Sequence, residues 1–369
     1  MRSVSGSGDA GPLPYRNQLE PGALIRRFEA CPPDGFAALR LAQGVPGFVA
    51  EFDLLTTAEP ALKQRLQGLP LYRWWSRLLR VRTAFVGTTV SEYALLPAAG
   101  NPGELARGLR KSLGRRFRLT VLKDLPQGSP LLDEAANAHA ERLAAACTEQ
   151  GFVLLEGQAL AYVAIDFASI DEYLARLSAA RRKDIRRKLR KREELDVRAV
   201  ATGAAFADEA RIDECYALYL NVYAQSEIHF DRLSREFFAS VLRDAQSGGI
   251  VFEYRHADRL IGYNLCFVHD GKLIDKYVGF RYPEARDCNL YFISWLVNLE
   301  YALAHGLSHY VAGWTDPQIK AYLGASFTFT RHAVYVRNPL LRRLARRFGG
   351  YLEGDRQWSE NRDALPDRP

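Results

Sequence analysis

The segment IVFEYRHADRLIGYNLCFVHDGKLIDKYVGF, residues 250–280, decides the fold of this chain. Its first part, Ile250–Arg255, and its second, Leu260–His269, are apolar runs joined by a polar turn. An Asp-Gly pair, typical of a tight hairpin turn, then leads into a third apolar run, Lys272–Phe280. The segment therefore predicts an antiparallel meander of three strands.

A long helix is predicted directly after the meander. Apolar residues recur at helical spacing through Leu290–His305, and Gly306 is a natural C-terminal residue for a helix. A short strand at His309–Gly313 follows, then a turn that carries a lysine, and then a last strand that reaches Tyr335. The chain thus has a specific order of elements: three strands, a helix, a strand, a turn and a strand.

This order resembles the core of the GNAT acyltransferase fold, and its details resemble the FemAB-like and CelD-like (BioF2-like) transferases. Two landmarks of those families recur here: the basic helix Ala180–Glu194 before the sheet, and the turn Lys320–Gly324 after the helix-strand unit. The resemblance covers roughly the second half of the chain. It implies an α/β (α+β) fold with mixed, mainly antiparallel sheets flanked by helices, in two tandem GNAT-like units.

The length of 369 residues also favours two domains. The first half alternates helices and strands, including a strand expected at Ala84–Leu96 and a helix at Asp133–Gln150. No sequence identity between the halves is visible, so a duplication is implied by the resemblance alone. The expected segments are a flexible tail (1–22), a degenerate GNAT-like domain (23–168), a GNAT-like acyltransferase domain (169–340), and a basic C-terminal helix and tail (341–369).

Composition narrows the location of the protein. The first residues contain no apolar signal region, and no run of about 18 apolar residues occurs. The five cysteines are scattered without a C-x-x-C pair or a nearby pair of histidines. This pattern favours reduced thiols in a cytoplasmic protein over a metal site or a disulfide framework.

The positive charge of the chain is clustered. The net charge is +7 and the pI is about 9.1. Nine of the twelve residues in 181–192 are Lys or Arg, and further clusters lie at 107–118 and after Pro339. Such clusters favour polyanions, such as cofactor phosphates, a nucleotide-linked substrate, tRNA or an anionic lipid surface. No recognised RNA-binding motif accompanies the basic helix, and the helix also occurs in CelD-like proteins without a known RNA role.

Acyl transfer to an amine needs a polarised carbonyl, a deprotonated amine and a stabilised leaving group. Lys320 lies where the resembling families place a lysine, and it is a catalytic candidate. Asp275 and Tyr277 are the other two; strand alternation places both on one face, with Lys276 on the opposite face. The alternatives are a surface role for Lys320 and a solvent-facing sheet surface for the strand residues. The resemblance also implies that backbone amides of Lys272–Phe280 contact the oxyanion.

Further residues are candidates for binding. Five residues are substrate-binding candidates. Tyr263 and Asn264 lie on the strand next to Lys272–Phe280, and Trp314 lies before the lysine turn. Glu227 and His229 lie in a loop that borders the acceptor site in the resembling families. Cofactor-binding candidates surround the position of the phosphate loop of acetyl-CoA enzymes: Arg281, Tyr282, Arg286 and Asn289. That loop normally holds the pyrophosphate on glycine-rich backbone, but Arg281–Asn289 contains no glycine. The N-terminus of the following helix still favours an anion.

Three functions are compatible with these residues. The first is an N-acyltransferase that moves an acyl group from a thioester donor, acyl-CoA or a carrier protein, to a small-molecule or cell-wall-type amine by direct attack in a cleft between the two units. The second is an aminoacyl transferase that uses aminoacyl-tRNA, as some FemAB-like relatives do. The third is a non-catalytic GNAT-like binding protein. In both enzymatic hypotheses the donor is a co-substrate, and no cofactor is bound permanently.

Overall fold

The computed structural model describes residues 15–41, 44–55, 65, 68–70, 72–226 and 229–348. Within these residues the chain forms one eleven-stranded sheet, in the order β1-β2-β3-β4-β11-β5-β10-β9-β8-β7-β6. The strands are β1 (Ala37–Arg40), β2 (Pro46–Asp53), β3 (Arg80–Val86), β4 (Leu119–Gln127), β5 (Val153–Ala164), β6 (Asp196–Ala201), β7 (Gly249–His256), β8 (Arg259–His269), β9 (Lys272–Phe280), β10 (His309–Gly313) and β11 (Ser326–Val336).

The predicted meander is confirmed. β7, β8 and β9 pair antiparallel in sequence order, and the Asp270-Gly271 turn joins the last two. β10 then pairs with β9 in the parallel direction. The last strand, β11, lies between β4 and β5, so it joins the second half of the chain to the first. The mixed, mainly antiparallel α/β fold is therefore as expected.

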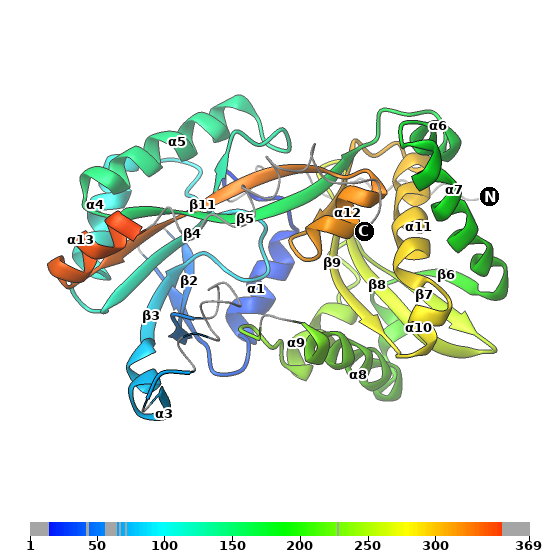
Figure 1. The fold of residues 1–369 in the computed structure, drawn as a ribbon, viewed down its shortest axis with the longest axis horizontal. Coiled ribbons are helices and arrows are strands. Elements are labelled where there is room, and N and C mark those ends of the chain that lie inside the picture. The colour runs from blue at the N-terminus through cyan, green and yellow to red at the C-terminus, as the bar shows by residue number, and fades with distance from the viewer. Residues whose placement is uncertain are drawn as a thin grey trace.

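Helices cover both faces of the sheet (Figure 1). One apolar cluster packs α6, α7 and α11 on one face of β5 and β7–β10, and another packs α1, α8 and α9 against the strands. A third lies between α4, α5 and β2–β4 with β11. The helices are α1 (Gly22–Ala30), α3 (Tyr72–Trp75), α4 (Pro102–Ser112), α5 (Glu134–Glu149), α6 (Ile170–Ala175), α7 (Ala179–Leu189), α8 (Glu209–Gln225), α9 (Arg235–Leu242), α10 (Glu284–Asp287), α11 (Leu290–Ala304), α12 (Pro317–Leu323) and α13 (Pro339–Phe348).

Local sequence explains where several of these helices begin. Asn101 caps α4 by accepting hydrogen bonds from the backbone N–H groups of Gly103 and Glu104, and Pro102 occupies the first turn. Asp133 caps α5 through the N–H of Ala136. Short 3₁₀ turns at Ser76–Leu79, Arg190–Glu194 and Ala204–Phe206 complete the regular structure of the described residues.

Two predictions for the first half are wrong. The strand expected at 84–96 ends at Val86, because Gly87 turns the chain with a φ of 116° and residues 88–96 form a mostly buried loop. The flexible tail expected over residues 1–22 does not extend to residues 17–20, whose side chains are all buried. Residues 1–14 and 349–369 lie outside the described residues. Both corrected segments line the centre of the sheet, where they supply charged groups to the candidate active site.

The remaining predictions about organisation stay predictions. The expected domain boundary at residue 168 falls between β5 and α6, but the sheet itself continues across both halves. None of the helices in the described part of the chain has the length and apolar character that a membrane crossing needs.

Candidate active site

The sheet opens at its centre, where β9 and β10 separate. The parallel pairing of these strands ends at Ile274 and Val311, and β10 continues beside β5 with an irregular register. β9 instead follows β8 as far as Phe280. Beyond Ile274, the β9 backbone amides that face away from β8 therefore have no strand partner in the described sheet, and they are free to donate to a bound group.

Asp275 is the first β9 residue beyond this separation. Its Oδ2 accepts hydrogen bonds from Asn264 Nδ2 (2.9 Å), Asn298 Nδ2 (3.0 Å) and the Tyr310 hydroxyl (3.0 Å). Its Oδ1 is buried and has no hydrogen-bond partner among the described residues. Burial raises the pKa of Asp275 to about 6, although the hydrogen bond from Tyr310 and the charge of Lys320 lower it. The carboxyl group is therefore suited to exchange a proton near neutral pH.

Lys320 is buried, with 4% of its surface exposed, so the alternative of a surface lysine is wrong. It lies on α12, and its Nζ donates a hydrogen bond of 2.6 Å to the carbonyl oxygen of Ala312, where β10 leaves β9. Burial lowers the pKa of Lys320 to about 8, against the charges of Asp275 and Asp316. An acid with a raised pKa and a lysine with a lowered pKa thus influence each other at the strand separation.

Two other elements hold α12 in place. Arg181 of α7 donates hydrogen bonds to the carbonyl oxygens of Ala321 and Tyr322, and the Tyr173 hydroxyl donates to that of Leu323. The basic helix and the lysine turn, which were separate landmarks in the sequence, are therefore in direct contact. The Arg181 side chain has a structural role at the C-terminal end of α12.

Tyr277 does not share a face with Asp275, so this prediction is wrong. β9 carries a β-bulge: Leu265 pairs with Tyr277 and Cys266 with Asp275, which leaves Lys276 without a partner on β8. The extra residue reverses the expected alternation. Asp275 contacts Asn298 of α11, whereas the Tyr277 ring packs on Phe237 and Phe238 of α9, on the opposite side of the sheet.

The two candidates on β8 are separated in the same way. Asn264 donates to Asp275 and belongs to the site. Tyr263 is fully buried in the apolar cluster that contains α8 and α9. The two residues therefore do not line one cleft, because neighbouring residues of a regular strand point to opposite faces.

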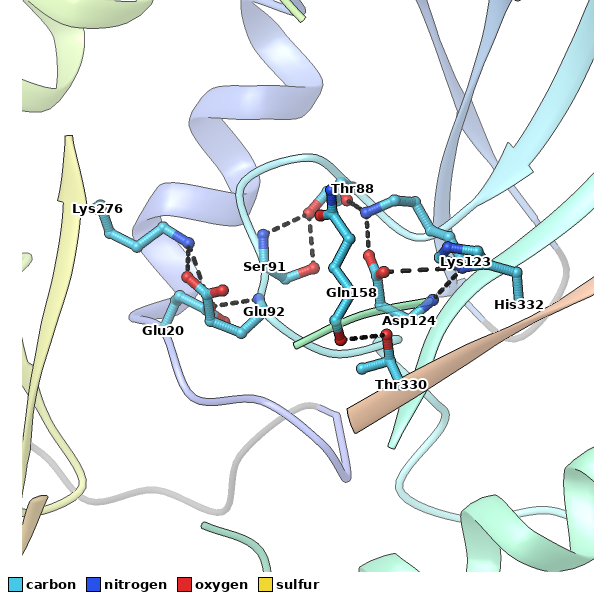
Figure 2. Close-up of polar contacts among 10 residues, drawn as sticks. All are labelled: Glu20, Thr88, Ser91, Glu92, Lys123, Asp124, Gln158, Lys276, Thr330 and His332. Atoms are coloured by element: carbon cyan, nitrogen blue, oxygen red, sulfur yellow. Dashed lines mark hydrogen bonds and ion pairs between the residues drawn. The ribbon is translucent and has the colours of Figure 1, made fainter. Parts of the chain in front are cut away.

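The bulge directs Lys276 to a buried pair of carboxylates that sequence reasoning missed. The Lys276 ammonium is paired with Glu92 and lies 3.5 Å from Glu20 Oε1, and the same Glu20 oxygen accepts a hydrogen bond of 2.6 Å from the Glu92 backbone N–H (Figure 2). Glu20 and Glu92 have exposures of 0% and 1%. The three side chains come from the segment before α1, the loop after β3, and β9, so they connect both halves of the chain at the separation.

Two carboxylates share one lysine in this cluster. Burial raises the pKa of Glu20 to about 7, with Lys276 lowering it and Glu92 raising it. Burial lowers the pKa of Lys276, but its two carboxylate partners outweigh burial and hold the pKa above its usual value. Glu20 can therefore carry a proton near neutral pH while Lys276 stays charged. The signal in the sequence was a glutamate inside the apolar run VSEYALL, at position 92.

A second polar cluster lies beside the first, toward β4 and β11 (Figure 2). Lys123 forms an ion pair with Asp124 and donates to the carbonyl oxygen of Thr88 (2.8 Å). The Asp124 backbone N–H donates to His332 Nδ1 (3.1 Å). Burial lowers the pKa of His332, so this imidazole is neutral and accepts at Nδ1.

The remaining substrate-binding candidates lie in different surroundings. Trp314 packs edge-to-face on Tyr93, with ring centroids 6.5 Å apart, beside a small apolar cluster that contains Ile274 and Val311. It therefore lines the strand separation. His229 is exposed and packs on Tyr223 of α8. Glu227 lies outside the described residues.

Comparison with known proteins agrees with this fold. Residues 125–362 match the FemAB-like family, described as peptidoglycan biosynthesis/recognition. The chain belongs to the FemAB-like family. It is thus an acyltransferase with the GNAT fold, as the order of its helices and strands indicated. No curated protein matches the chain in sequence.

Two solved structures share the fold of this FemAB-like protein. One is the C-terminal domain of a protein assigned as a lysylphosphatidylglycerol synthetase from Agrobacterium fabrum, with a TM-score of 0.54 and 10% identity over 92% of this chain and 94% of that one. The other is FemX, with a TM-score of 0.50 and 11% identity over 91% and 96% of the two chains. At these identities the likeness concerns the fold.

The FemAB-like chain has a short helix where acetyl-CoA enzymes have a glycine-rich loop. α10 occupies residues Glu284–Asp287 and leads into α11 through Asn289, which is left-handed and makes no side-chain cap. Arg281 donates to the carbonyl oxygen of Leu260 and to Glu214, and Arg286 donates to Gln225 while it lies 4.8 Å from the centre of the Tyr282 ring. The four cofactor-binding candidates are thus close together, but both arginines already have protein partners.

Proposed function

We propose that this FemAB-like chain transfers an acyl group from an activated donor to an amine acceptor where β9 and β10 separate. The observation that carries the proposal is that two buried groups, Asp275 and Lys320, both lie at that point and affect each other through their charges, one with a raised and the other with a lowered pKa. Both groups exchange protons near neutral pH, which is what deprotonation of an amine and protonation of a leaving group require.

The amine attacks the acyl carbon directly. A carbon–nitrogen bond forms, the bond from the acyl carbon to the donor sulfur or oxygen breaks, the amine proton passes to Asp275 Oδ1, and Lys320 gives a proton to the leaving group. The unpaired β9 amides stabilise the negative charge on the carbonyl oxygen. A covalent cysteine intermediate is not favoured, because burial raises the pKa of the nearby Cys266 thiol well above its usual value.

The first donor that we propose is an acyl thioester, either acyl-CoA or an acylated carrier protein. Aminoacyl-tRNA is the second candidate, and one observation favours it: α10 replaces the glycine-rich loop, and Arg281 and Arg286 are engaged by protein groups. The family description, peptidoglycan biosynthesis/recognition, supports an amine of the peptidoglycan-precursor type as acceptor.

The test is a donor and acceptor panel analysed by mass spectrometry. Acyl-CoAs, an acylated carrier protein and aminoacyl-tRNAs are each incubated with peptidoglycan-precursor and simple amines, and the mass of an acylated amine is sought. A donor that binds the native chain also raises its melting temperature. Lys320→Met and Asp275→Asn should each lower turnover by about 10²-fold.

The matched control is Tyr277→Phe. It removes a buried hydroxyl on the opposite face of the same strand and should leave turnover within about threefold of the wild type. The proposal is wrong if no donor yields an acylated amine, or if Lys320→Met and Asp275→Asn both keep wild-type turnover.

A further inference from the structure

An arginine-lined pocket lies away from the active site, at one end of the sheet. It has a volume of about 430 Å³, and five of its eight lining residues are arginines, against a single acidic residue, Glu51. These five residues, Arg80, Arg82, Arg116, Arg118 and Arg337, define the arginine pocket. A concave surface with this excess of positive charge is suited to an anion.

The strand register explains why these arginines meet. Arg80 and Arg82 begin β3, and their alternate positions put them on the same face. Arg118 precedes β4, and its carbonyl oxygen accepts a hydrogen bond of 3.0 Å from the N–H of Arg337, which follows β11. The first residues of β3 and β4 and the last residues of β11 thus lie at the same end of the sheet.

The arginines of the pocket are available for a ligand. All five are exposed. Within the described residues, the side chains of Arg80, Arg82 and Arg118 form no ion pair, in contrast to α7, where Arg186, Arg187 and Lys188 are each paired with an aspartate. The two basic regions therefore differ: the charges of α7 are largely paired within the fold, and those of Arg80, Arg82 and Arg118 are not.

An amphipathic helix begins two residues after Arg337. Asn338 caps α13 by accepting from the N–H groups of Leu340 and Leu341. Leu340, Leu341 and Leu344 lie on one side of this helix, and they are 70%, 56% and 53% exposed. The opposite side faces the protein, with the Arg342 guanidinium 4.7 Å from the centre of the Tyr335 ring. The helix therefore presents its apolar side to solvent.

A further exposed apolar residue lies at the same end of the molecule. Trp74 of α3 is 81% exposed, and α3 and α13 both lie at the end opposite to α7 (Figure 1). Single exposed apolar residues are ordinary on protein surfaces, but three leucines on one helix side beside a set of arginines are typical of an interaction site.

We propose that α13 and the arginine pocket form a docking surface for an anionic lipid bilayer. Leu340, Leu341 and Leu344 enter the boundary between headgroups and acyl chains, and the arginines bind lipid phosphates. A nucleic acid would use the arginines but would gain nothing from three exposed leucines, so the combination favours a lipid surface. The surface would hold the chain at a membrane through a patch that is distinct from the candidate active site.

Vesicle sedimentation of the full chain tests this proposal. Vesicles of phosphatidylglycerol and phosphatidylcholine should bind the wild type, whereas vesicles of phosphatidylcholine alone should not. Leu341→Ser with Leu344→Ser, and Arg80→Ala with Arg118→Ala, should each weaken binding at least tenfold. These side chains are exposed, so the melting temperature should stay unchanged. The charge-matched control, Lys183→Ala with Arg190→Ala on the far side of the molecule, should bind like the wild type.

Other occupants of the surface give distinct results. If the leucine variant loses no vesicle binding, or if the chain binds neither kind of vesicle, the proposal is overturned. It is also overturned if the arginine variant loses binding to tRNA while vesicle binding persists, since the pocket would then serve a nucleic acid. A leucine variant that changes the mass in light scattering without a change in vesicle binding would assign the helix side to a contact between copies of the chain, against the proposal.

Discussion

Replacement of Lys320 by methionine tests the burial of a charged lysine at the active site without any substrate. Burial lowers the pKa of Lys320 from its usual 10.5 to about 8. Because each pKa unit corresponds to about 1.4 kcal/mol, the folded protein loses about 3 kcal/mol by keeping this lysine charged. The unfolded chain binds this proton up to about pH 10.5, but the folded chain releases it from about pH 8. Wild-type stability therefore rises with pH across that window.

Methionine removes this titration. At pH 7 the relief of the buried charge roughly offsets the loss of the hydrogen bond to Ala312, since an unsatisfied buried carbonyl costs about 1–3 kcal/mol. The two proteins should then have similar free energies of unfolding. Between about pH 8 and 10.5 the wild type should become more stable than Lys320→Met, by up to about 3 kcal/mol.

Urea unfolding of both proteins at a series of pH values measures this difference directly. Lys183→Met is the matched control, because it makes the same substitution at a lysine that is exposed on α7. A constant difference between the wild type and Lys320→Met from about pH 7 to 10.5 would refute the reasoning. The lysine would then be solvated, and its assignment to the reaction would lose its physical basis.

Four further variants test other parts of the site. Asp275→Asn should be more stable than the wild type at pH 7, by about 1–3 kcal/mol. The pKa of Asp275 is raised to about 6, so the wild type loses stability as the pH rises from about 4 to 6. A stability difference that does not vary with pH over this range would contradict the assignment. Lys276→Met should destabilise the folded protein by about 3–5 kcal/mol, since it leaves two buried carboxylates without their lysine. Glu20→Gln should be tolerated at about pH 8. Equal losses of stability for the two variants in urea unfolding would exclude the shared-lysine arrangement. Gly324→Ala should lower the free energy of unfolding by more than about 1 kcal/mol and should also lower turnover. The φ of Gly324 is 103°, and an added Cβ would lie 2.9 Å from the Tyr173 hydroxyl. A variant as stable and active as the wild type would show that α12 tolerates movement.

The strands around the site could be predicted because their signals are local. The alternation in residues 250–280, the Asp-Gly turn and the helical spacing that ends at Gly306 each depend on neighbours within a few residues. The resemblance to the FemAB-like family added the position of Lys320. These signals were sufficient to select Asp275 and Lys320 as catalytic candidates.

The faces of β9 could not be predicted, because a bulge adds one residue without a strong local sign. Strict alternation places Asp275 with Tyr277, and only the charged Lys276 in mid-strand marked the irregularity. The burial of Lys320 was equally hidden, since a lysine in a short helix is usually exposed. Glu20 and Glu92 are 72 positions apart, and nothing in the sequence signals that one accepts a hydrogen bond from the backbone of the other.

The stability of the fold alone does not require the cluster of Lys276, Glu20 and Glu92. Removing each ion from water costs several kcal/mol, and replacement of a buried ion pair by apolar residues of similar size is often neutral or stabilising. An apolar junction would therefore serve the fold at least as well. The arrangement instead joins the bulge of β9 to two segments of the first half at the point where the amides of β9 become free. A charged cluster at that position holds the bulge of β9, beyond which Tyr277 lies on the face opposite to Asp275, and this geometry, rather than added stability, offsets the cost of the buried charges.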